Sequence, residues 1–329
     1  MTDEPIEPGL VTTRSDMKDL FGGSEYSGGI VPSSSTPNVL IYSDPKAGEQ
    51  SGYFDGWLPD DDYGPLFEYT GHGQEDQTFT GTKGNGNRAV LLHIDQGRAL
   101  RVFKACGTVR GSNTKLQRYI GKFQLDADQP YVVREAPNKQ GKKRRVIVFR
   151  MRPDGPYVQL DEDTIPTAVE TQSLTVPANV TTAAIVEPET NKKTASQRSA
   201  SPKTQAERRE AKLSDQFQEF MATHGHSMMR FQLQVKGMAS TLLTDLYDTT
   251  AHVLYELKGS SSRESVRMAI GQLLDYRRHV NPSNPALAIL LPEEPHDDLK
   301  DLLHAVDVTL VYWDGTTFID VPSLDNRDA

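Results

Sequence analysis

The chain of 329 residues has one cysteine, Cys106, which excludes an internal disulfide framework and any zinc site built from several cysteines. It has no apolar run of the roughly 18 residues that a transmembrane helix needs. Its first residues are acidic and lack an apolar stretch, so a secretory signal is not expected. No Gly-x-x-x-x-Gly-Lys-Ser/Thr phosphate loop is found, so ATP is not expected as a cofactor. These absences predict a soluble cytoplasmic protein without a membrane partner.

The net charge of −9 hides an uneven distribution along the chain. Residues 1–97 carry 5 Lys/Arg and 16 Asp/Glu, whereas residues 98–152 carry 15 Lys/Arg and 3 Asp/Glu. A basic segment between acidic ones is typical of a polyanion-binding surface, although a charged hairpin turn or a localisation signal would look similar. The densest part consists of four consecutive basic residues, Lys142, Lys143, Arg144 and Arg145.

The length predicts about two domains. Residues 1–160 are expected to form a mostly β domain with a curved, barrel-type sheet. The first part of this domain, residues 1–35, is expected to be a loop-like lead-in. Its β-type runs alternate with turn residues and lie at 39–42, 89–92, 100–103, 131–133 and 146–149. Residues 161–204 are rich in Thr, Ser, Ala, Pro and charge, and predict a flexible linker.

Residues 205–329 are expected to form an α/β domain with a mixed sheet. Leu213, Phe217 and Met221 fall on one stripe and predict a helix over residues 205–223. The order of elements is then α-β-β-β-α-β-α-β, which is typical of a sheet flanked by helices. The further strands are predicted at 230–235, 241–247, 253–257, 287–291 and 308–312, and the further helices at 263–280 and 296–305.

Charged residues mark the hairpin predicted between residues 241 and 257. A turn near Thr250 would pair Asp245 with Glu256, and residues two apart share a strand face, so Lys258 projects beside Glu256. Two carboxylates and an ammonium suit Mg²⁺ (or Mn²⁺) together with a phosphate, with Asp245 and Glu256 as the metal ligands. The alternative is a surface salt bridge between Glu256 and Lys258.

Gln272 and Tyr276 lie four apart on the next predicted helix and share one of its faces. With Asp245, Glu256 and Lys258, they resemble the motifs of the PD-(D/E)XK nuclease superfamily and its RecB-like branch. The resemblance covers about residues 205–320 and implies a catalytic site at these five residues. It also implies an acid on the first helix, for which Glu210 is the candidate and Glu207 and Glu219 are alternatives.

One position of this motif has a competing residue, and another departs from the superfamily pattern. Asp248 competes with Asp245 for the role of first metal ligand, and the expected hairpin register favours Asp245. Thr244 stands where the superfamily name has Pro.

A Gly-rich segment in the first domain carries a second pattern. It reads Tyr69-Thr70-Gly71, then Asp76-Gln77, then Asn87-Arg88-Ala89, and its bland interpretation is a surface loop. This order is similar to the signature of SRA (SET- and RING-associated) domains, in the variant of McrA-type restriction enzymes. The resemblance implies that the domain extrudes a modified cytosine from duplex DNA, which requires aromatic faces and a carboxylate.

The SRA resemblance assigns the pocket residues. Tyr53 and Tyr69 correspond to the stacking pair, Asp55 to the acceptor for the cytosine amino group, and Thr70 to a neighbour of the base edge. Arg88 and the basic residues at 142–145 would contact DNA phosphates. The alternatives are Asp60, Asp61 or Asp62 in place of Asp55, and Trp57 as the stacking face.

Together, the two resemblances predict a modification-dependent, type IV-like restriction endonuclease for phage defence. It would flip 5-methylcytosine or 5-hydroxymethylcytosine and hydrolyse nearby phosphodiester bonds with Mg²⁺. One nuclease site cuts one strand, so a homodimer is expected for double-strand cleavage. The alternatives are a non-catalytic reader with a structural nuclease-like domain, and an RNA-binding β domain fused to a repair nuclease.

Overall fold

The computed structural model describes residues 5–25, 28–44, 48, 55–127, 129–178 and 202–321, with the backbone alone for 202–208. The chain divides into two compact units, Met1–Thr167 and Ala168–Ala329. None of the helices that the structure describes has the length and apolar character of a membrane-spanning segment.

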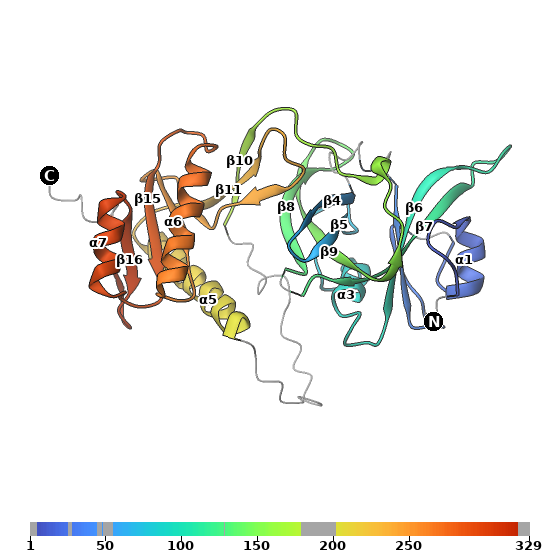
Figure 1. The fold of residues 1–329 in the computed structure, drawn as a ribbon, viewed down its shortest axis with the longest axis horizontal. Helices are drawn as coiled ribbons and strands as arrows, with labels where there is room; N and C mark the ends of the chain where they lie inside the picture. The colour runs from blue at the N-terminus through green and yellow to red at the C-terminus, as the bar shows by residue number, and fades with distance from the viewer. Residues whose placement is uncertain are drawn as a thin grey trace. The chain divides into compact units, whose positions relative to one another are not determined.

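The described strands of the first unit form one curved, mixed sheet (Figure 1). Its order is β2-β3-β6-β7-β9-β5-β4, with β1 on β7 and β8 on β9. Among these pairs β3 and β6 run parallel, and the others are antiparallel. The expected mostly β domain is therefore confirmed. The strands are β1 (Val11–Thr12), β2 (Ile30–Pro32), β3 (Asn38–Ser43), β4 (Gly56–Asp61), β5 (Gly64–Thr70), β6 (Ala99–Thr108), β7 (Lys115–Leu125), β8 (Tyr131–Pro137) and β9 (Lys143–Tyr157).

The expected loop-like lead-in is wrong in part, because it contains helix α1 (Arg14–Phe21). Thr13 and Asp16 form a capping box, in which each side chain accepts a backbone N–H of the other residue. Met17 and Phe21, four apart, are both 3% exposed and pack in a core cluster with strand residues. The capping box and the apolar pair are short signals that the surrounding Gly and Ser obscure.

The predicted strand at 89–92 is also wrong, because helix α3 (Asn85–Leu91) covers most of it. A short apolar run fits a buried helix as well as a buried strand. Here Asn87 and Val90 are fully buried and lie three apart, as one face of a helix requires.

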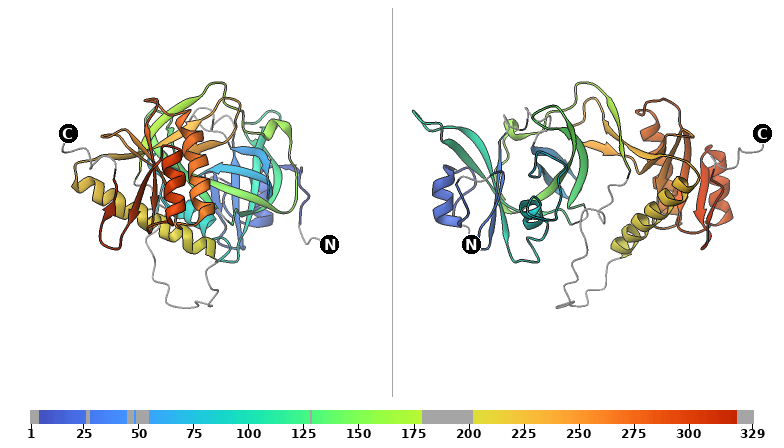
Figure 2. Two further views of the ribbon diagram at one scale, coloured as in Figure 1. Left: turned by 60° about the vertical axis from the view of Figure 1, so that its left-hand side comes forward. Right: turned by 180° about the vertical axis from the view of Figure 1, so that it is seen from behind.

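The second unit is a mixed sheet with helices, as expected (Figure 2). Strand pairs β14–β15 and β15–β16 are parallel, and the other described pairs are antiparallel. The helices are α5 (Pro202–Thr223), α6 (Arg263–Arg277) and α7 (Asp297–Ala305). The strands are β10 (Gln172–Pro177), β11 (Met228–Gln234), β12 (Thr241–Leu243), β13 (Leu246–Asp248), β14 (Val253–Leu257), β15 (Ala286–Leu291), β16 (Thr309–Trp313) and β17 (Phe318–Ile319).

The expected linker over residues 161–204 is corrected at its beginning. Residues 161–163 form a short 3-10 helix, η1 (Asp161–Asp163), and β10 pairs with β11 over six residues. Composition hides this strand because its partner lies far along the chain. The rest of the expected linker, 179–201, lies outside the described residues.

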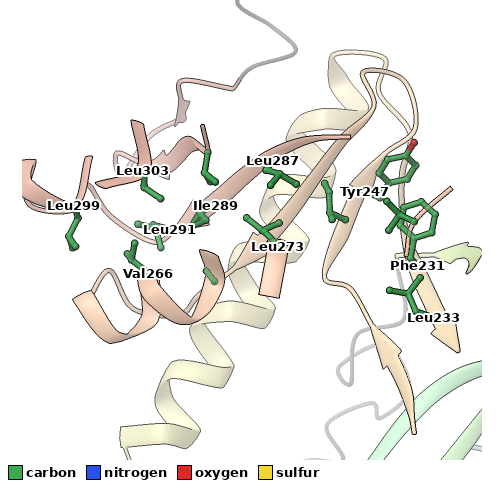
Figure 3. Close-up of a cluster of buried hydrophobic side chains, with 14 residues drawn as sticks. Phe231, Leu233, Tyr247, Val266, Leu273, Leu287, Ile289, Leu291, Leu299 and Leu303 are labelled. Atoms are coloured by element: carbon green, nitrogen blue, oxygen red, sulfur yellow. The ribbon is translucent and has the colours of Figure 1, made fainter. Parts of the chain in front are cut away.

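Side chains alternate between the two faces of the sheet along the central strands of the second unit, and both faces carry apolar residues. On β15, Leu287, Ile289 and Leu291 pack in one cluster with helices α6 and α7 (Figure 3). Ala288 and Leu290 point to the opposite face, in a second cluster with helix α5. Residues two apart on β14 therefore point to the same face of the sheet. The same periodicity places Lys258, just after β14, on the face of Glu256.

Candidate functional site

The predicted hairpin register brings two carboxylates together in the second unit. Leu246 pairs with Tyr255 and Asp248 with Val253, so Asp245, just before β13, comes opposite Glu256. Asp245 Oδ2 accepts a hydrogen bond from the Leu257 backbone N–H at 2.7 Å. The carboxylates thus meet at the end of a short, buried hairpin.

Lys258 and Glu210 complete this carboxylate site. Lys258 Nζ donates to Glu256 Oε1 at 2.7 Å, and Glu256 itself is 1% exposed. Glu210 on α5 accepts the backbone N–H of Gly259 through Oε2 at 3.2 Å. Sequence positions 210, 245, 256 and 258 therefore converge, as the motif predicted.

Burial and like charge perturb the acids of this site. Burial raises the pKa of Glu256 well above its ordinary value, and the negative charge of Asp245 raises it further. Burial also raises the pKa of Asp245, against the opposing effect of the Lys258 ammonium. For Lys258, burial lowers the pKa, but the charges of Glu256 and Asp245 outweigh it and the net shift is upward.

Three further residues act on this site. Gln272 Nε2 lies 3.5 Å from the Tyr276 hydroxyl on α6. Burial and the charge of Glu256 raise the pKa of Tyr276 to about 12, so this phenol stays protonated at neutral pH. Arg230 on β11 was not predicted, yet its pKa is lowered by burial and raised in part by Asp245, which places its charge near that carboxylate. A lone Arg between the apolar residues Met229 and Phe231 is the sequence signal that could have pointed to it.

The alternatives for the carboxylate site have other positions or roles. Asp248 is fully buried and accepts the backbone N–H groups of Thr250 and Ala251, so it holds the hairpin turn. Glu219 is exposed, and the side chain of Glu207 lies outside the described part. Thr244 donates its N–H to Phe231 O at 3.0 Å, a bond that Pro at this position would lack.

The donor set of the carboxylate site fits a small divalent cation. Among the described residues no cluster of three or more His, Cys, Asp or Glu is arranged to hold a metal. Mg²⁺, however, is usually held by one or two carboxylates, waters and substrate phosphates. Glu256 Oε2 is buried without a hydrogen-bond partner in the described structure, and the charge of the second carboxylate, Asp245, raises the pKa of Glu256. A cation between the two carboxylates would give Glu256 Oε2 a ligand and would reduce the repulsion between Glu256 and Asp245.

Asp55 is the centre of the candidate base pocket in the first unit. It precedes β4, and its Oδ1 accepts the backbone N–H of Thr70 on β5 at 2.7 Å. Its Oδ2 accepts the Ser43 hydroxyl on β3 at 3.2 Å. Burial raises the pKa of Asp55 to about 6, although these two hydrogen bonds and the Lys104 charge oppose the increase. The alternatives Asp60, Asp61 and Asp62 are all exposed, away from these partners.

The aromatic residues predicted for the pocket differ in their positions. Tyr69 is 4% exposed, and its hydroxyl donates weakly to the Tyr42 carbonyl at 3.5 Å. Tyr53 lies outside the described residues. Trp57 as a stacking face is wrong, because it is fully buried and its ring packs against Phe67 and Phe123 at 5.2 and 5.7 Å.

The Gly-rich motif next to Asp55 holds a loop together. Asn87 accepts the His72 N–H and donates to the carbonyls of His72 and Thr78. Gln77 donates to the Gly71 carbonyl at 2.6 Å and accepts the Ile147 N–H. A Cβ on Gly71 would lie 2.8 Å from both amide oxygens, so Gly is required there. Asn87 and Gln77 thus act on the shape of the pocket wall.

The basic residues predicted to contact DNA have unequal exposure. Lys142 and Lys143 are exposed, and Arg145 is partly exposed and pairs with Asp76 at 2.8 Å. Arg144 is 4% exposed, so its predicted phosphate contact is wrong: a buried guanidinium does not reach a surface phosphate. Arg88 is half-buried and donates to Asn85 Oδ1.

Much of the remaining charge of segment 98–152 is neutralised within the unit. Arg134 and Arg150 both pair with Glu68, which is 1% exposed. Arg152 pairs with Asp61 and Asp126. The number of basic residues in this segment therefore overstates the positive charge available to a polyanion, because acidic residues from outside the segment and within it pair with several of them.

A comparison with known protein families identifies the first unit. Residues 9–171 match the family model described as "ScoMcrA-like, SRA domain". These residues are an SRA domain of the ScoMcrA type. The match ends at residue 171, and the type of the second unit is not identified by it. No curated protein is found to be similar in sequence.

Several solved structures are similar to part of the chain. The type IV phosphorothioation-dependent restriction endonuclease ScoMcrA is 22% identical over 49% of this chain and 28% of its own length, with a TM-score of 0.33. The SRA domain of SUVH5, solved with fully methylated CG DNA, is 20% identical over 48% of this chain and 96% of its own length, with a TM-score of 0.32. The DNA recognition domain of the cytosine modification-dependent restriction endonuclease LpnPI is 15% identical over 46% of this chain and 73% of its own length, with a TM-score of 0.32.

Proposed function

We propose that this protein is a modification-dependent DNA endonuclease whose SRA domain reads a modified cytosine and whose second unit hydrolyses nearby phosphodiester bonds. The observation that carries the proposal is the convergence of Glu210, Asp245, Glu256 and Lys258 in a chain that contains an SRA domain. A buried pair of acids with a lysine has a large free-energy cost, and such groups are retained where a ligand or a reaction needs them.

The pocket chemistry suits an extruded 5-methylcytosine or 5-hydroxymethylcytosine. An ionised Asp55 accepts a hydrogen bond from the cytosine amino group, with Thr70 and Ser43 fixing its orientation. Tyr69, and Tyr53 as the SRA resemblance implies, would supply the stacking that the base loses on leaving the duplex. Exposed Lys142 and Lys143 would contact phosphates without reading the sequence.

The carboxylate site suits metal-assisted hydrolysis. Asp245 and Glu256 would hold Mg²⁺ or Mn²⁺, which supplies a Lewis acid for the phosphate and lowers the pKa of a bound water. Lys258, held by Glu256 at 2.7 Å, would orient the attacking water and stabilise the charge that develops on the phosphate. Tyr276 and Gln272 would face the same phosphate from α6. Two copies of the chain would cut the two strands.

The test uses matched plasmids that carry either 5-methylcytosine or unmodified cytosine. The full-length protein should cut the modified plasmid with Mg²⁺ and should not cut it with EDTA. Glu256→Gln should abolish cutting and leave binding to modified DNA within a few fold, whereas Glu293→Gln, an exposed control in the same unit, should cut normally. Equal cutting of both plasmids, or normal cutting by Glu256→Gln, would contradict the proposal; binding without cutting would leave a non-catalytic reader.

A further inference from the structure

A row of alternating charges lies behind Asp55 in the SRA domain. Lys104 on β6 is 5% exposed, and its Nζ lies 3.3 Å from Asp163 Oδ1 on η1. Asp163 is 1% exposed and accepts two hydrogen bonds from Arg118 Nη2, at 2.7 and 2.8 Å. Arg118 also pairs with the exposed Glu162 at 2.8 Å. The row therefore extends from solvent at Glu162 to Lys104 in the interior.

The sheet register places Lys104 next to the carboxylate of the pocket. Strands β3 and β6 are parallel, with Ser43 directly opposite Lys104, so their side chains point to the same face. Ser43 is also the residue whose hydroxyl donates to Asp55 Oδ2. The positive charge of Lys104 acts on Asp55 and lowers its pKa, against the larger effect of burial.

The hydrogen-bond donors to Asp55 that the structure describes are neutral. From β5 it receives the Thr70 backbone N–H, and from β3 the Ser43 hydroxyl. Asp44, the next residue along the chain, pairs with the exposed Lys115. Among the described residues, Lys104 is thus the charged side chain that acts on Asp55.

The charges around Lys104 favour the ionised form of Asp55. Arg118 holds Asp163 through two short hydrogen bonds and also pairs with Glu162, whose side chain is exposed and solvated. Among the groups away from solvent, Lys104 and Arg118 then face Asp163 alone, and a positive charge that no second anion balances is costly in the interior. An ionised Asp55 is that anion, so these four inner groups are neutral only in this state.

We propose that Lys104 is a positioning residue for base recognition, which keeps Asp55 ionised so that its carboxylate accepts the amino group of a flipped cytosine. This inference rests on the proposed function of the SRA domain. Ionisation matters because cytosine presents an amino donor where thymine presents a carbonyl acceptor. A protonated Asp55 would lose its preference for the amino-bearing base.

The experiment measures binding of the full chain to duplexes with a single 5-methylcytosine or a thymine at the same position, between about pH 5.5 and 8.5, because these two bases differ in the amino group and share the methyl group. Lys104→Gln should lower the preference for the modified duplex roughly tenfold near pH 6, and the preference should return to within about twofold of wild type at pH 8.5, where Asp55 ionises without help. Lys115→Gln is the matched control, because this lysine lines a pocket of about 430 Å³ together with Lys104 but pairs with Asp44.

A second variant has an effect of opposite sign. Asp163→Asn removes the competing anion, so Lys104 acts more strongly on Asp55 and the preference should persist to lower pH than in wild type. Loss of packing would instead weaken binding in both variants at every pH.

Two results would overturn the inference: a wild-type pH profile for Lys104→Gln, or shifts of Lys104→Gln and Asp163→Asn in the same direction. A wild-type protein without preference at any pH would refute the proposed function itself, and the inference with it.

Discussion

The buried carboxylate of the base pocket should make the SRA domain less stable at neutral pH than an amide at the same position. Asp55→Asn keeps the size of the side chain and an oxygen that can accept the Thr70 N–H. It removes the negative charge that burial disfavours. We therefore expect this variant to be more stable than wild type at pH 7.5 while it loses its preference for modified DNA.

The magnitude follows from the pKa of Asp55, which burial raises from 3.8 to about 6. A difference of roughly two units corresponds to about 3 kcal/mol, since one unit is worth about 1.4 kcal/mol. We therefore expect a gain of about 1–3 kcal/mol for Asp55→Asn.

The sign follows from the direction of the shift. A folded-state pKa above the unfolded one means that the folded protein binds more protons between about pH 4 and 6. Stability from this group is full below about pH 4 and is lost as the pH rises through about 6. The advantage of Asp55→Asn should therefore be small at pH 4, grow between pH 4 and 6, and stay constant above.

The assay is urea unfolding of the first unit, followed by the fluorescence of Trp57. The chain has two tryptophans, and a Trp313→Phe background leaves the fully buried Trp57 as the reporter. Asp60→Asn, at an exposed position, controls for a general effect of removing one negative charge. An Asp55→Asn advantage that is absent at pH 7.5, or equal at pH 4 and 7.5, would refute the reasoning.

Three further predictions concern other parts of the chain. Trp57→Ala should destabilise the SRA domain by about 3–5 kcal/mol in urea unfolding followed by circular dichroism, because it empties a core site. Charge reversal of Lys142 and Lys143 should weaken modified and unmodified duplexes by the same factor and reduce the salt dependence of binding, and a selective loss would contradict their assignment to phosphates. Glu210→Gln should lower the cleavage rate at least tenfold, whereas Glu219→Gln, exposed on the same helix, should cut modified plasmid like wild type.

The position of Asp245 opposite Glu256 could be predicted from the sequence because the geometry that produces it is local. Strand alternation and one tight turn determine that Asp245 meets Glu256 and that Lys258 lies beside it. Both constraints act within fourteen residues. The candidate from α5, Glu210, depended on the family resemblance, since nothing local specifies where a helix packs.

The base pocket was harder to predict because its partners come from distant strands. Lys104 looks like one more basic residue in segment 98–152 until β3 and η1 place Ser43 and Asp163 beside it. Trp57 was misjudged for the same reason. Its environment is made by Phe67 and Phe123, which local sequence does not connect to it.

The charge balance of the two sites distinguishes the ligands they suit. In the candidate base pocket, Lys104 and Arg118 balance Asp163 and an ionised Asp55, while the exposed Glu162 pairs with Arg118 from the solvent side. Under the proposed function, this balance suits a neutral base with a hydrogen-bond donor.

In the carboxylate site, Glu210, Asp245 and Glu256 exceed the charges of Lys258 and Arg230 by one. A buried excess negative charge is stabilised by a cation or by a proton, and the raised pKa of Glu256 shows that the protein alone favours the proton. A divalent cation competes with that proton for the same oxygens. The two candidate sites therefore hold similar side chains, and they differ in the balance of charge among the residues named above.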